Sequence, residues 1–424
     1  MLFRFSCSNF FSIRDAQELS LIADRTVSDR TLFNIPGSNL KALPCAAIYG
    51  ANASGKSNFL NAIDFARSTI VNSHARFAPD RPISYSIFSL DKKAANEVSQ
   101  FEFDFDVSGV RYSYGFSILS GFINTEFLYA YPQGHKQSWF VRDNSAKKKF
   151  KFSKYLKGKN AIVADLTRAN SLFLSAAAQQ NHDQLTPIFE FFGSRLKFFV
   201  DHDSSHLPHV AKLLDGPRRE WILEFLKGAD FGINDFKLEK EKPAPKFESA
   251  MRNFLVELAP NEEEKKKVPA TFGDMLRPKL GHPGKDNEIV YLPWHAESAG
   301  TQRLLELLGP TLDVLETGGV AVIDELDASL HTEIAKSIVR LFKDIKINTN
   351  GAQLLFTTHD TNLLCSGDLN RDEIWFSEKS PFGETVIYPL SDFKVRDTDN
   401  FEKGYLQGRF GAVPFVGKLK NVPK

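Results

Sequence analysis

The segment GANASGKS, residues 50–57, constrains the fold of this 424-residue chain more than any other. It matches G-x-x-x-x-G-K-[ST], with the apolar run 45–49 before it and a helix-like stretch after it. In such a strand–loop–helix, backbone N–H groups and the helix N-terminus surround a phosphate. We expect Lys56 to reach the β- and γ-phosphates of ATP, and Ser57 to ligate Mg²⁺. The residues predicted to hold the nucleotide are Gly50, Asn52, Ala53, Ser54, Gly55, Lys56, Ser57 and Asn58.

A second segment, VAVIDE at residues 320–325, places Asp324 and Glu325 at the end of an apolar run. Open α/β sheets bind their ligands at the carboxyl edge of such strands. We expect Asp324 to hold Mg²⁺ through water, and Glu325 to polarise the attacking water as a general base. Taken alone, the segment also fits a buried strand that ends in a solvated acidic turn.

The spacing of these motifs indicates a particular class of P-loop protein. Lys56 and Asp324 are 268 positions apart, too far for a compact AAA+ or small-GTPase core. ABC-type ATPases accommodate an inserted lobe and carry a signature loop before the second motif. ESAGTQ, residues 297–302, fits that loop, with Ser298 and Gly300 at a helix N-terminus aimed at the γ-phosphate held by another protomer. The alternative is an ordinary helix cap at Ser298.

Two further residues fit the same class of site. Asp327 follows the acidic pair and fits the D-loop that crosses a dimer seam. His359 follows the apolar run QLLFTT, residues 353–358, and fits a switch histidine that contacts the γ-phosphate; otherwise it is a structural histidine. Between Ala53 and Ser99 there is no glutamine, so no residue is assigned to a Q-loop.

The order of apolar patterns predicts an α/β fold. After residue 300, segments with helical spacing alternate with buried strands, which is typical of a parallel sheet. In residues 100–130, apolar and polar residues alternate, which is typical of an antiparallel β-lobe. We predict an ABC-type P-loop head, with a mostly parallel sheet, an antiparallel β-lobe and an inserted, largely helical lobe. The predicted parts are 1–130 with the phosphate loop and β-lobe, 131–285 as the inserted lobe, 286–395 with the signature and second motif, and 396–424 as a tail.

Composition restricts the classes of partner and compartment. The chain has 53 Lys plus Arg against 52 Asp plus Glu, so nucleic acid or a membrane could be attracted only by a local patch. Cys7, Cys45 and Cys365 form no CxxC pair, which argues against a disulfide framework and suits a reducing compartment. No signal-peptide core is present, and no apolar stretch approaches the ~20 residues of a membrane span. We therefore expect a cytoplasmic protein without membrane contact.

Two other clusters suggest chemistry of their own. The run KKKFKFSKYLKGK, from Lys147 to Lys159, holds seven lysines with three aromatic residues between them. This pattern predicts contact with the phosphates and bases of nucleic acid, or else a solvated lysine-rich hairpin. A second cluster, DHDSSHLPH, could form a metal or nuclease site, and its role stays open. The residues concerned are Phe150, Phe152 and Tyr155 in the first cluster, and Asp201, His202, Asp203, His206 and His209 in the second.

Together these motifs resemble a family of ABC-class ATPases of bacterial defence, the RloA/AbiL-type abortive-infection ATPases, whose heads are similar to those of SMC and OLD proteins. The resemblance extends to FSCSNFFSIRDAQELSL, RDEIWFSEK and the closing KGYLQGRFGAVPF. It implies an ATP-dependent sensor or regulator of anti-phage defence. Such a protein would form a homodimer or higher oligomer through its ATP-bound heads and would act with a separately encoded nuclease-like partner.

Other interpretations remain at this stage. An SMC- or RecF-like DNA-binding ATPase of repair or recombination would share the same motifs. A transporter ATPase subunit needs a membrane partner and a smaller, less basic insertion. The closing glycine- and aromatic-rich segment fits either a docking element or a packed terminus.

Overall fold

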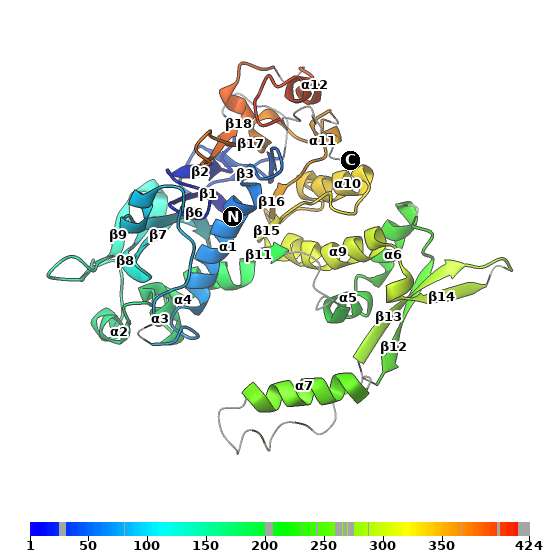
Figure 1. Ribbon diagram of the computed structural model, residues 1–424, viewed down its shortest axis with the longest axis horizontal. Helices are drawn as coiled ribbons and strands as arrows, with labels where there is room; N and C mark the ends of the chain where they lie inside the picture. The colour runs from blue at the N-terminus through cyan, green and yellow to red at the C-terminus, as the bar shows by residue number, and fades with distance from the viewer. Residues whose placement is uncertain are drawn as a thin grey trace, which may run out of the picture. The chain divides into compact units, whose positions relative to one another are not determined.

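The computed structural model describes residues 1–24, 31–79, 81–199, 207–229, 231–242, 245–258, 265, 269, 275–286, 288–365, 367–396 and 399–413. The chain divides into two compact units, Met1–Val200 with Thr311–Lys424, and Asp201–Pro310. Figure 1 shows the ribbon of both units, coloured by residue number along the chain. Of the predicted Asp/His cluster, Asp201, His202, Asp203 and His206 lie outside the described residues, and His209 is described only as part of a helix.

The six-stranded sheet of the first unit consists largely of short apolar runs that are buried on both faces. Five of its strands run parallel, and β18 closes one edge antiparallel to β17. This burial is typical of the parallel sheets of α/β folds, so the predicted fold class is confirmed at that level. In spatial order the strands are β11 (Leu196–Phe199), β15 (Val320–Ile323), β16 (Gln353–Thr357), β5 (Cys45–Tyr49), β17 (Ile374–Lys379) and β18 (Thr385–Pro389).

A seven-stranded antiparallel sheet forms the second layer of this unit. The predicted hairpin turn is present at Ser108 and Gly109, which adopt φ of 51° and 77°, as a tight two-residue hairpin requires. The predicted boundary at residue 130 falls inside a strand, because the sheet continues to Phe152. In spatial order the strands are β10 (Phe150–Phe152), β9 (Gln137–Asp143), β8 (Phe122–Tyr131), β7 (Val110–Leu119), β6 (Ser99–Val107), β1 (Leu2–Ser8) and β2 (Gln17–Ser20), and a separate pair is formed by β3 (Phe33–Asn34) and β4 (Lys41–Ala42).

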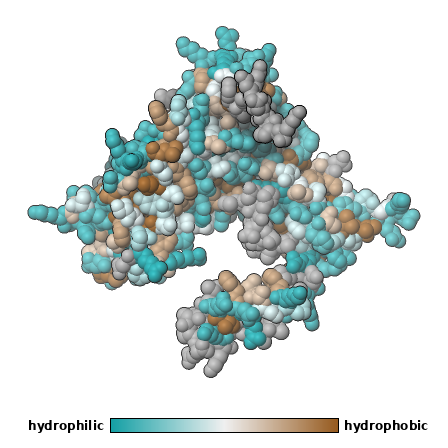
Figure 2. Space-filling model, in the orientation of Figure 1, coloured by the Kyte–Doolittle hydropathy of each residue, from teal (hydrophilic) through white to brown (hydrophobic). Residues whose placement is uncertain are grey.

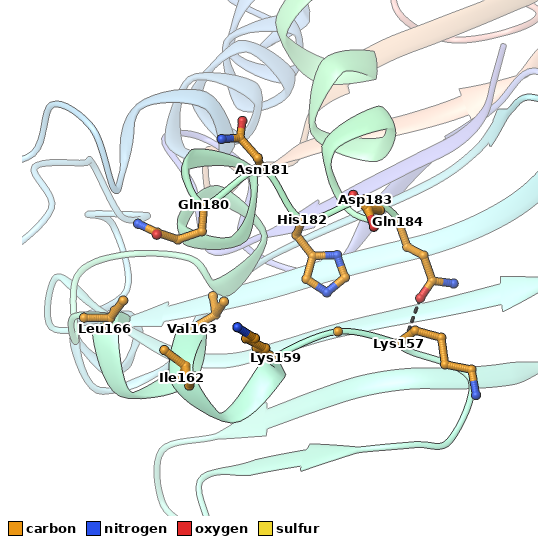
Figure 3. A pocket seen from close by; sticks show the side chains of 11 residues that line it. Lys157, Lys159, Ile162, Val163, Leu166, Gln180, Asn181, His182, Asp183 and Gln184 are labelled. Carbon is orange, nitrogen blue, oxygen red and sulfur yellow. Dashed lines mark hydrogen bonds between the residues drawn. The ribbon is translucent and has the colours of Figure 1, made fainter.

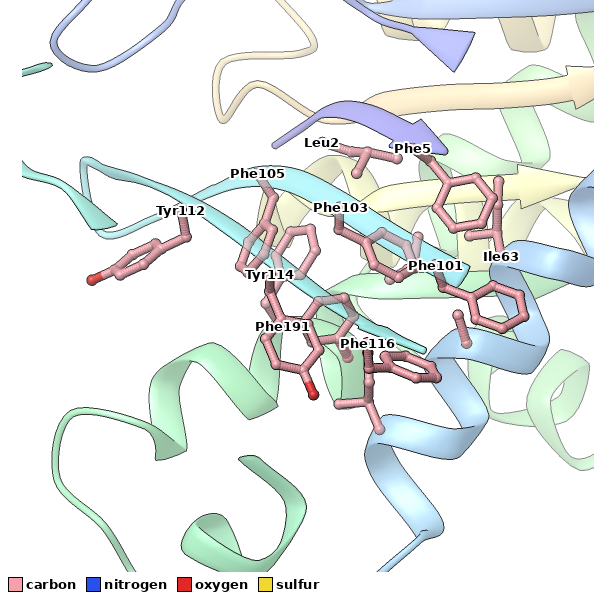
Figure 4. Packing of buried hydrophobic residues seen from close by; sticks show 14 of the residues in the cluster. Leu2, Phe5, Ile63, Phe101, Phe103, Phe105, Tyr112, Tyr114, Phe116 and Phe191 are labelled. Atoms are coloured by element: carbon pink, nitrogen blue, oxygen red, sulfur yellow. The ribbon is translucent and has the colours of Figure 1, made fainter. Parts of the chain in front are cut away.

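Phenylalanine rings fill the core next to this antiparallel sheet (Figure 4). Phe5 and Phe103 lie 4.7 Å apart between ring centroids, and Phe105 stacks on Phe191 at 4.6 Å. Helix α1 (Lys56–Asn72) belongs to the same cluster through its buried face, which includes Ile63. Because the core is close-packed, these rings fix the position of α1 against the antiparallel sheet.

A buried ion pair ties the antiparallel sheet to the helices that follow it. Glu126 on β8 is 0% exposed and Arg142 on β9 is 2% exposed, with 3.7 Å between the carboxylate and the guanidinium. Glu126 also accepts hydrogen bonds from the Tyr114 hydroxyl at 2.9 Å and from the backbone N–H of Phe173 at 2.7 Å. Burial raises the pKa of Glu126, while Arg142 opposes that shift. The helices that follow the sheet are α2 (Asn160–Leu166), α3 (Phe173–Gln179) and α4 (Thr186–Glu190), and Glu126 contacts the first of the α3 residues.

The second unit differs from the predicted inserted lobe of residues 131–285. It spans Asp201–Pro310, because residues 131–199 continue the sheets and core of the first unit. It is also not simply helical, since three antiparallel strands pair within it. Its elements are α5 (Leu207–Leu214), α6 (Arg219–Gly228), β12 (Asp235–Glu241), α7 (Pro245–Leu258), β13 (Met275–Pro283), β14 (Ile289–Pro293) and the start of α9 (Ala299–Thr317).

The described part of the C-terminal tail packs against the six-stranded sheet. Tyr405 stacks on Phe376 of β17 at 5.5 Å, and Phe410 is 5.8 Å from the same ring. Up to residue 413 the tail is therefore a packed terminus. Over the described residues, no helix has the length and apolar character to cross a membrane. The remaining helices of this part are α10 (Thr332–Lys343), α11 (Asn362–Cys365) and α12 (Phe401–Leu406).

Candidate nucleotide site

The strand order of the six-stranded sheet brings three distant motifs to one edge. β16 lies between β5 and β15, and all three strands are parallel. Their carboxyl ends therefore meet at the edge where α/β sheets bind ligands. The phosphate loop follows β5, Asp324 follows β15, and His359 follows β16.

The phosphate loop wraps tightly because two glycines lie against other strands. A Cβ on Gly50 would lie 2.3 Å from the Ser377 carbonyl oxygen, and one on Gly55 would lie 1.9 Å from Oγ1 of Thr385. Gly55 also has φ of 106°, which L side chains rarely adopt. The hydroxyls of Ser377 and Thr385 donate to the Ser54 carbonyl at 3.2 and 2.9 Å. These two supports of the loop lie more than 300 residues away in sequence, and no local signal indicates them.

Lys56 folds back over the phosphate loop. Its ammonium donates to the carbonyl oxygens of Gly50 at 2.8 Å and Ala51 at 3.2 Å, and the residue is only 6% exposed. Burial lowers the pKa of Lys56, and Asp324, Glu325 and Asp327 oppose that shift. The lysine therefore lies within electrostatic reach of all three carboxylates.

Thr357, at the end of β16, fixes the acidic pair. Its hydroxyl donates to Oδ1 of Asp324 at 2.5 Å and accepts from the backbone N–H of Glu325 at 2.7 Å. Glu325 is exposed and has φ of 51°, a left-handed conformation that costs energy outside glycine. The turn that carries the two acids is therefore held in place, although Glu325 itself is exposed. Their backbone is anchored to the next strand.

His359 joins the cluster through Asp327. The backbone N–H of His359 donates to the Asp327 carboxylate at 3.2 and 3.3 Å. Desolvation and the nearby Lys56 lower the pKa of His359, while the three carboxylates raise it. The lowered pKa favours the neutral imidazole, in which one ring nitrogen can donate and the other can accept a hydrogen bond.

The other predicted loop residues divide into two groups. Asn52 and Ala53 are exposed at the loop, and Ser54 Oγ is buried without a hydrogen-bond partner among the described residues. A buried hydroxyl in that position fits a phosphate oxygen as its partner. Asn58 instead donates its amide to Ser12 Oγ at 2.7 Å, which joins α1 to the N-terminal segment. Asn58 therefore positions the loop rather than pointing to a phosphate.

The predicted Mg²⁺ ligands are compatible with that ion. In the described part of the chain, no group of three or more His, Cys, Asp or Glu side chains could hold a metal ion. Mg²⁺ does not need such a group, because it usually takes one or two protein oxygens and completes its shell with water and phosphate. Ser57 in the first turn of α1 and Asp324 offer oxygens of the required kind.

The signature residues lie in the second unit, at the start of α9. Ser298 Oγ accepts from the backbone N–H of Thr301 at 3.1 Å and shares a hydrogen bond with the Thr301 hydroxyl at 2.8 Å. The helix-cap alternative is therefore confirmed. Ser298 is also exposed, and Gly300 is partly exposed beside it. Their predicted contact with the nucleotide of another protomer stays a prediction.

Comparison with known proteins places these motifs in one family. A family model described as "AAA domain, putative AbiEii toxin, Type IV TA system" matches residues 45–366. That range begins at β5 and includes the phosphate loop, Asp324, Glu325 and His359. A search of curated proteins found no match to the chain. Since the family model covers well over half of the chain, this protein belongs to the family of AAA-type ATPase domains that the model describes.

Proposed function

We propose that this protein binds ATP with Mg²⁺ and hydrolyses it at the carboxyl edge of the six-stranded sheet. The observation that supports this most directly is geometric: the phosphate loop after β5, the acids after β15 and His359 after β16 lie at one carboxyl edge of the sheet. The charges of Asp324, Glu325 and Asp327 raise the pKa of both Lys56 and His359 there, against the effect of burial. A lysine beside a phosphate loop and a nearby carboxylate that can accept a proton are groups that phosphoryl transfer to water uses.

Each residue has a defined part in this proposal. Lys56 neutralises charge on the β- and γ-phosphates, and Glu325 accepts the proton of the attacking water. The neutral imidazole of His359 donates a hydrogen bond toward the γ-phosphate. Mg²⁺, held by Ser57 and by Asp324 through water, would neutralise developing charge on the phosphate oxygens.

The test of the hydrolytic site is Glu325→Gln, which keeps the shape of the side chain and removes its basicity. The variant should bind ATP normally by calorimetry and release phosphate about 10²–10⁴-fold more slowly. Glu333→Gln is the matched control, because Glu333 lies on α10 and pairs with Lys336 at 2.8 Å, outside the site. Normal phosphate release by Glu325→Gln would contradict the assignment of the base.

The same proposal includes a shared site between protomers. In an ABC-type dimer, Ser298 and Gly300 of one protomer would face the γ-phosphate bound to the other, with Asp327 at the seam. Two observations support this. The loop is exposed, and it begins a helix of 19 residues, whose dipole favours an anion at that end.

The biological role that we propose is that of an RloA/AbiL-type controller of abortive infection, acting with a separately encoded nuclease-like partner in the cytoplasm. The family match and the closing sequence motif support it. The test is the reading frame beside this gene. A nuclease whose activity changes when it is co-expressed with Glu325→Gln rather than the wild type supports the role. ATP turnover that needs DNA and no protein partner would instead favour an SMC- or RecF-like repair ATPase.

A further inference from the structure

Two adjoining cavities lie on the antiparallel sheet of the first unit, and no step of ATP hydrolysis uses them. The larger has a volume of ≈ 500 Å³ and contains Tyr112 of β7, Trp139 of β9 and Tyr155 in its wall. The smaller has a volume of ≈ 370 Å³ and lies beside α2. Lys157 and Gln184 contribute to both, so the two cavities adjoin each other. Both volumes lie in the ~300–1,000 Å³ range of small-ligand sites.

The larger cavity combines flat aromatic walls with an unused hydrogen-bond donor. Tyr112 and Trp139 are each 8% exposed, and their rings meet edge to face at 5.4 Å. The indole Nε1–H of Trp139 is buried and has no hydrogen-bond partner among the described residues. A buried donor without a partner costs free energy, and a ligand that supplies an acceptor would remove that cost. The exposed ring of Tyr155 adds a third aromatic surface.

The charge around both cavities is strongly positive. All seven lysines between residues 147 and 159 are exposed, and that run contains no acidic residue. Three of them, Lys154, Lys157 and Lys159, line the cavities, against one acid, Asp183. Figure 2 shows the neighbouring β9–β10 turn as a hydrophilic surface. The ligand is therefore expected to be an anion with a planar apolar part.

The structure changes which aromatic residues can take part. Phe150 and Phe152, predicted as stacking residues, are half-buried and lie 5.4 and 5.2 Å from the ring of Phe173. They belong to the hydrophobic core and hold the lysine-rich hairpin in place. The aromatic residues that line the larger cavity are instead Tyr112 of β7, Trp139 of β9 and the exposed Tyr155.

Lys157 and Gln184, which line both cavities, are held together by a hydrogen bond. The backbone N–H of Lys157 donates to Gln184 Oε1 at 2.6 Å, the bond drawn in Figure 3. Below it, His182 shares a hydrogen bond with Asn160 at 2.9 Å and is 8% exposed, so it serves as a structural support. Figure 3 also shows the apolar side chains Ile162, Val163 and Leu166 of α2 together along one side of the smaller cavity.

We propose that this surface binds single-stranded nucleic acid. An unpaired base enters the larger cavity against Trp139, and the next nucleotide lies over the apolar side of the smaller cavity. Lys154, Lys157 and Lys159 contact the phosphates. Stacking on aromatic rings combined with lysines along the backbone is how proteins hold single strands. A duplex does not fit, because its bases are stacked inside the helix. Two adjoining cavities also favour a strand with successive nucleotides over a single free nucleotide.

The test compares two double variants that remove the same charge. Lys154→Gln/Lys157→Gln changes the cavity walls, whereas Lys147→Gln/Lys148→Gln changes exposed lysines that line neither cavity. The probe is fluorescein-labelled oligo(dT) of about 12 nucleotides, within the ~4–16-nucleotide range of single-strand sites, and the readout is anisotropy over a salt series. The cavity variant should weaken binding at least about tenfold and reduce the salt slope by about 1.4, that is 0.7 for each lost phosphate contact. Equal losses in both variants, or no binding by the wild type, would overturn the proposal.

Trp139→Phe gives an independent readout, because it keeps an aromatic ring and removes the five-membered ring with its indole N–H. We expect about three- to tenfold weaker oligo(dT) binding, measured below the melting temperature of the variant. Competition with thymidine monophosphate distinguishes a site for a free mononucleotide from a site for a nucleic-acid strand. If the mononucleotide binds as tightly as the oligonucleotide, the strand proposal is wrong. The Lys56→Ala variant, which should be impaired in ATP binding, should still bind oligo(dT) normally. The proposal of nucleic-acid binding and the proposal of ATP hydrolysis are therefore tested independently.

Discussion

Thr357 shows how a single hydroxyl sets the geometry of this site. It donates to Asp324 and accepts from the backbone of Glu325, and its own carbonyl accepts from the N–H of Leu326 at 3.0 Å. The left-handed backbone of Glu325 costs on the order of 1–3 kcal/mol, and such strain persists only where the surroundings hold it. Thr357 is therefore a positioning residue for both acids.

Replacing Thr357 by Val keeps the shape and removes the hydroxyl. The Glu325 N–H and an Asp324 oxygen then lose their partner, so we expect a loss of about 1–3 kcal/mol in the free energy of unfolding. Misplacement of the acids should slow phosphate release on the order of 10²-fold. Thr357→Ser retains the hydroxyl and should keep most of both properties. If the Thr357→Val and Thr357→Ser variants release phosphate at the same rate, Thr357 does not position the two acids.

At the scale of elements, the buried Glu126 joins three strands to a helix. Its carboxylate lies near Arg142 of β9, accepts from Tyr114 of β7, and accepts from the N-terminal N–H groups of α3 at Phe173 and Leu174. Carboxylates are favoured at helix N-termini, because the free N–H groups and the dipole are positive there. This one side chain thereby joins the start of α3 to the antiparallel sheet.

Glu126→Ala leaves Arg142 buried without its charge partner, so we expect it to destabilise the protein by about 3–5 kcal/mol in denaturant titrations. The control is Glu18→Gln, which breaks an exposed pair with Arg4 that is 2.9 Å long. Exposed pairs contribute about 0–1 kcal/mol, so the control should unfold almost like the wild type. A second variant, Glu126→Ala with Arg142→Met, removes the uncompensated charge and should recover part of the loss. Similar small effects from Glu126→Ala and Glu18→Gln would mean that the buried pair is not needed.

At the scale of the whole molecule, the two parts of the proposed catalytic site lie in different units of the chain. Lys56 and Glu325 belong to the first unit, and Ser298 to the second. If protomers share sites, each active site needs the first unit of one chain and the second unit of another. Mutations in the two units should then complement each other.

Mixing two inactive variants tests this sharing. Ser298→Arg should bind ATP with near-normal affinity and fail to hydrolyse it, and Lys56→Ala should bind ATP about ten- to a hundredfold more weakly. In heterodimers of the two, one site combines an intact phosphate loop with an intact signature, so phosphate release should partly return. Normal hydrolysis by Ser298→Arg, or an inactive mixture despite demonstrated subunit exchange, would leave Ser298 as a helix cap only.

The sequence by itself determined the contiguous features of this protein. The phosphate loop, the acids after β15 and the histidine after β16 follow from strand, loop and helix patterns within short windows, as does the α/β fold class. Only the tertiary structure decided what surrounds them. Ser377 and Thr385 close on the phosphate loop, Asn58 turns to Ser12, and Trp139 opens into a cavity beside the lysine run. These contacts join residues far apart in the chain, so they depend on strand order and packing, which no local pattern encodes.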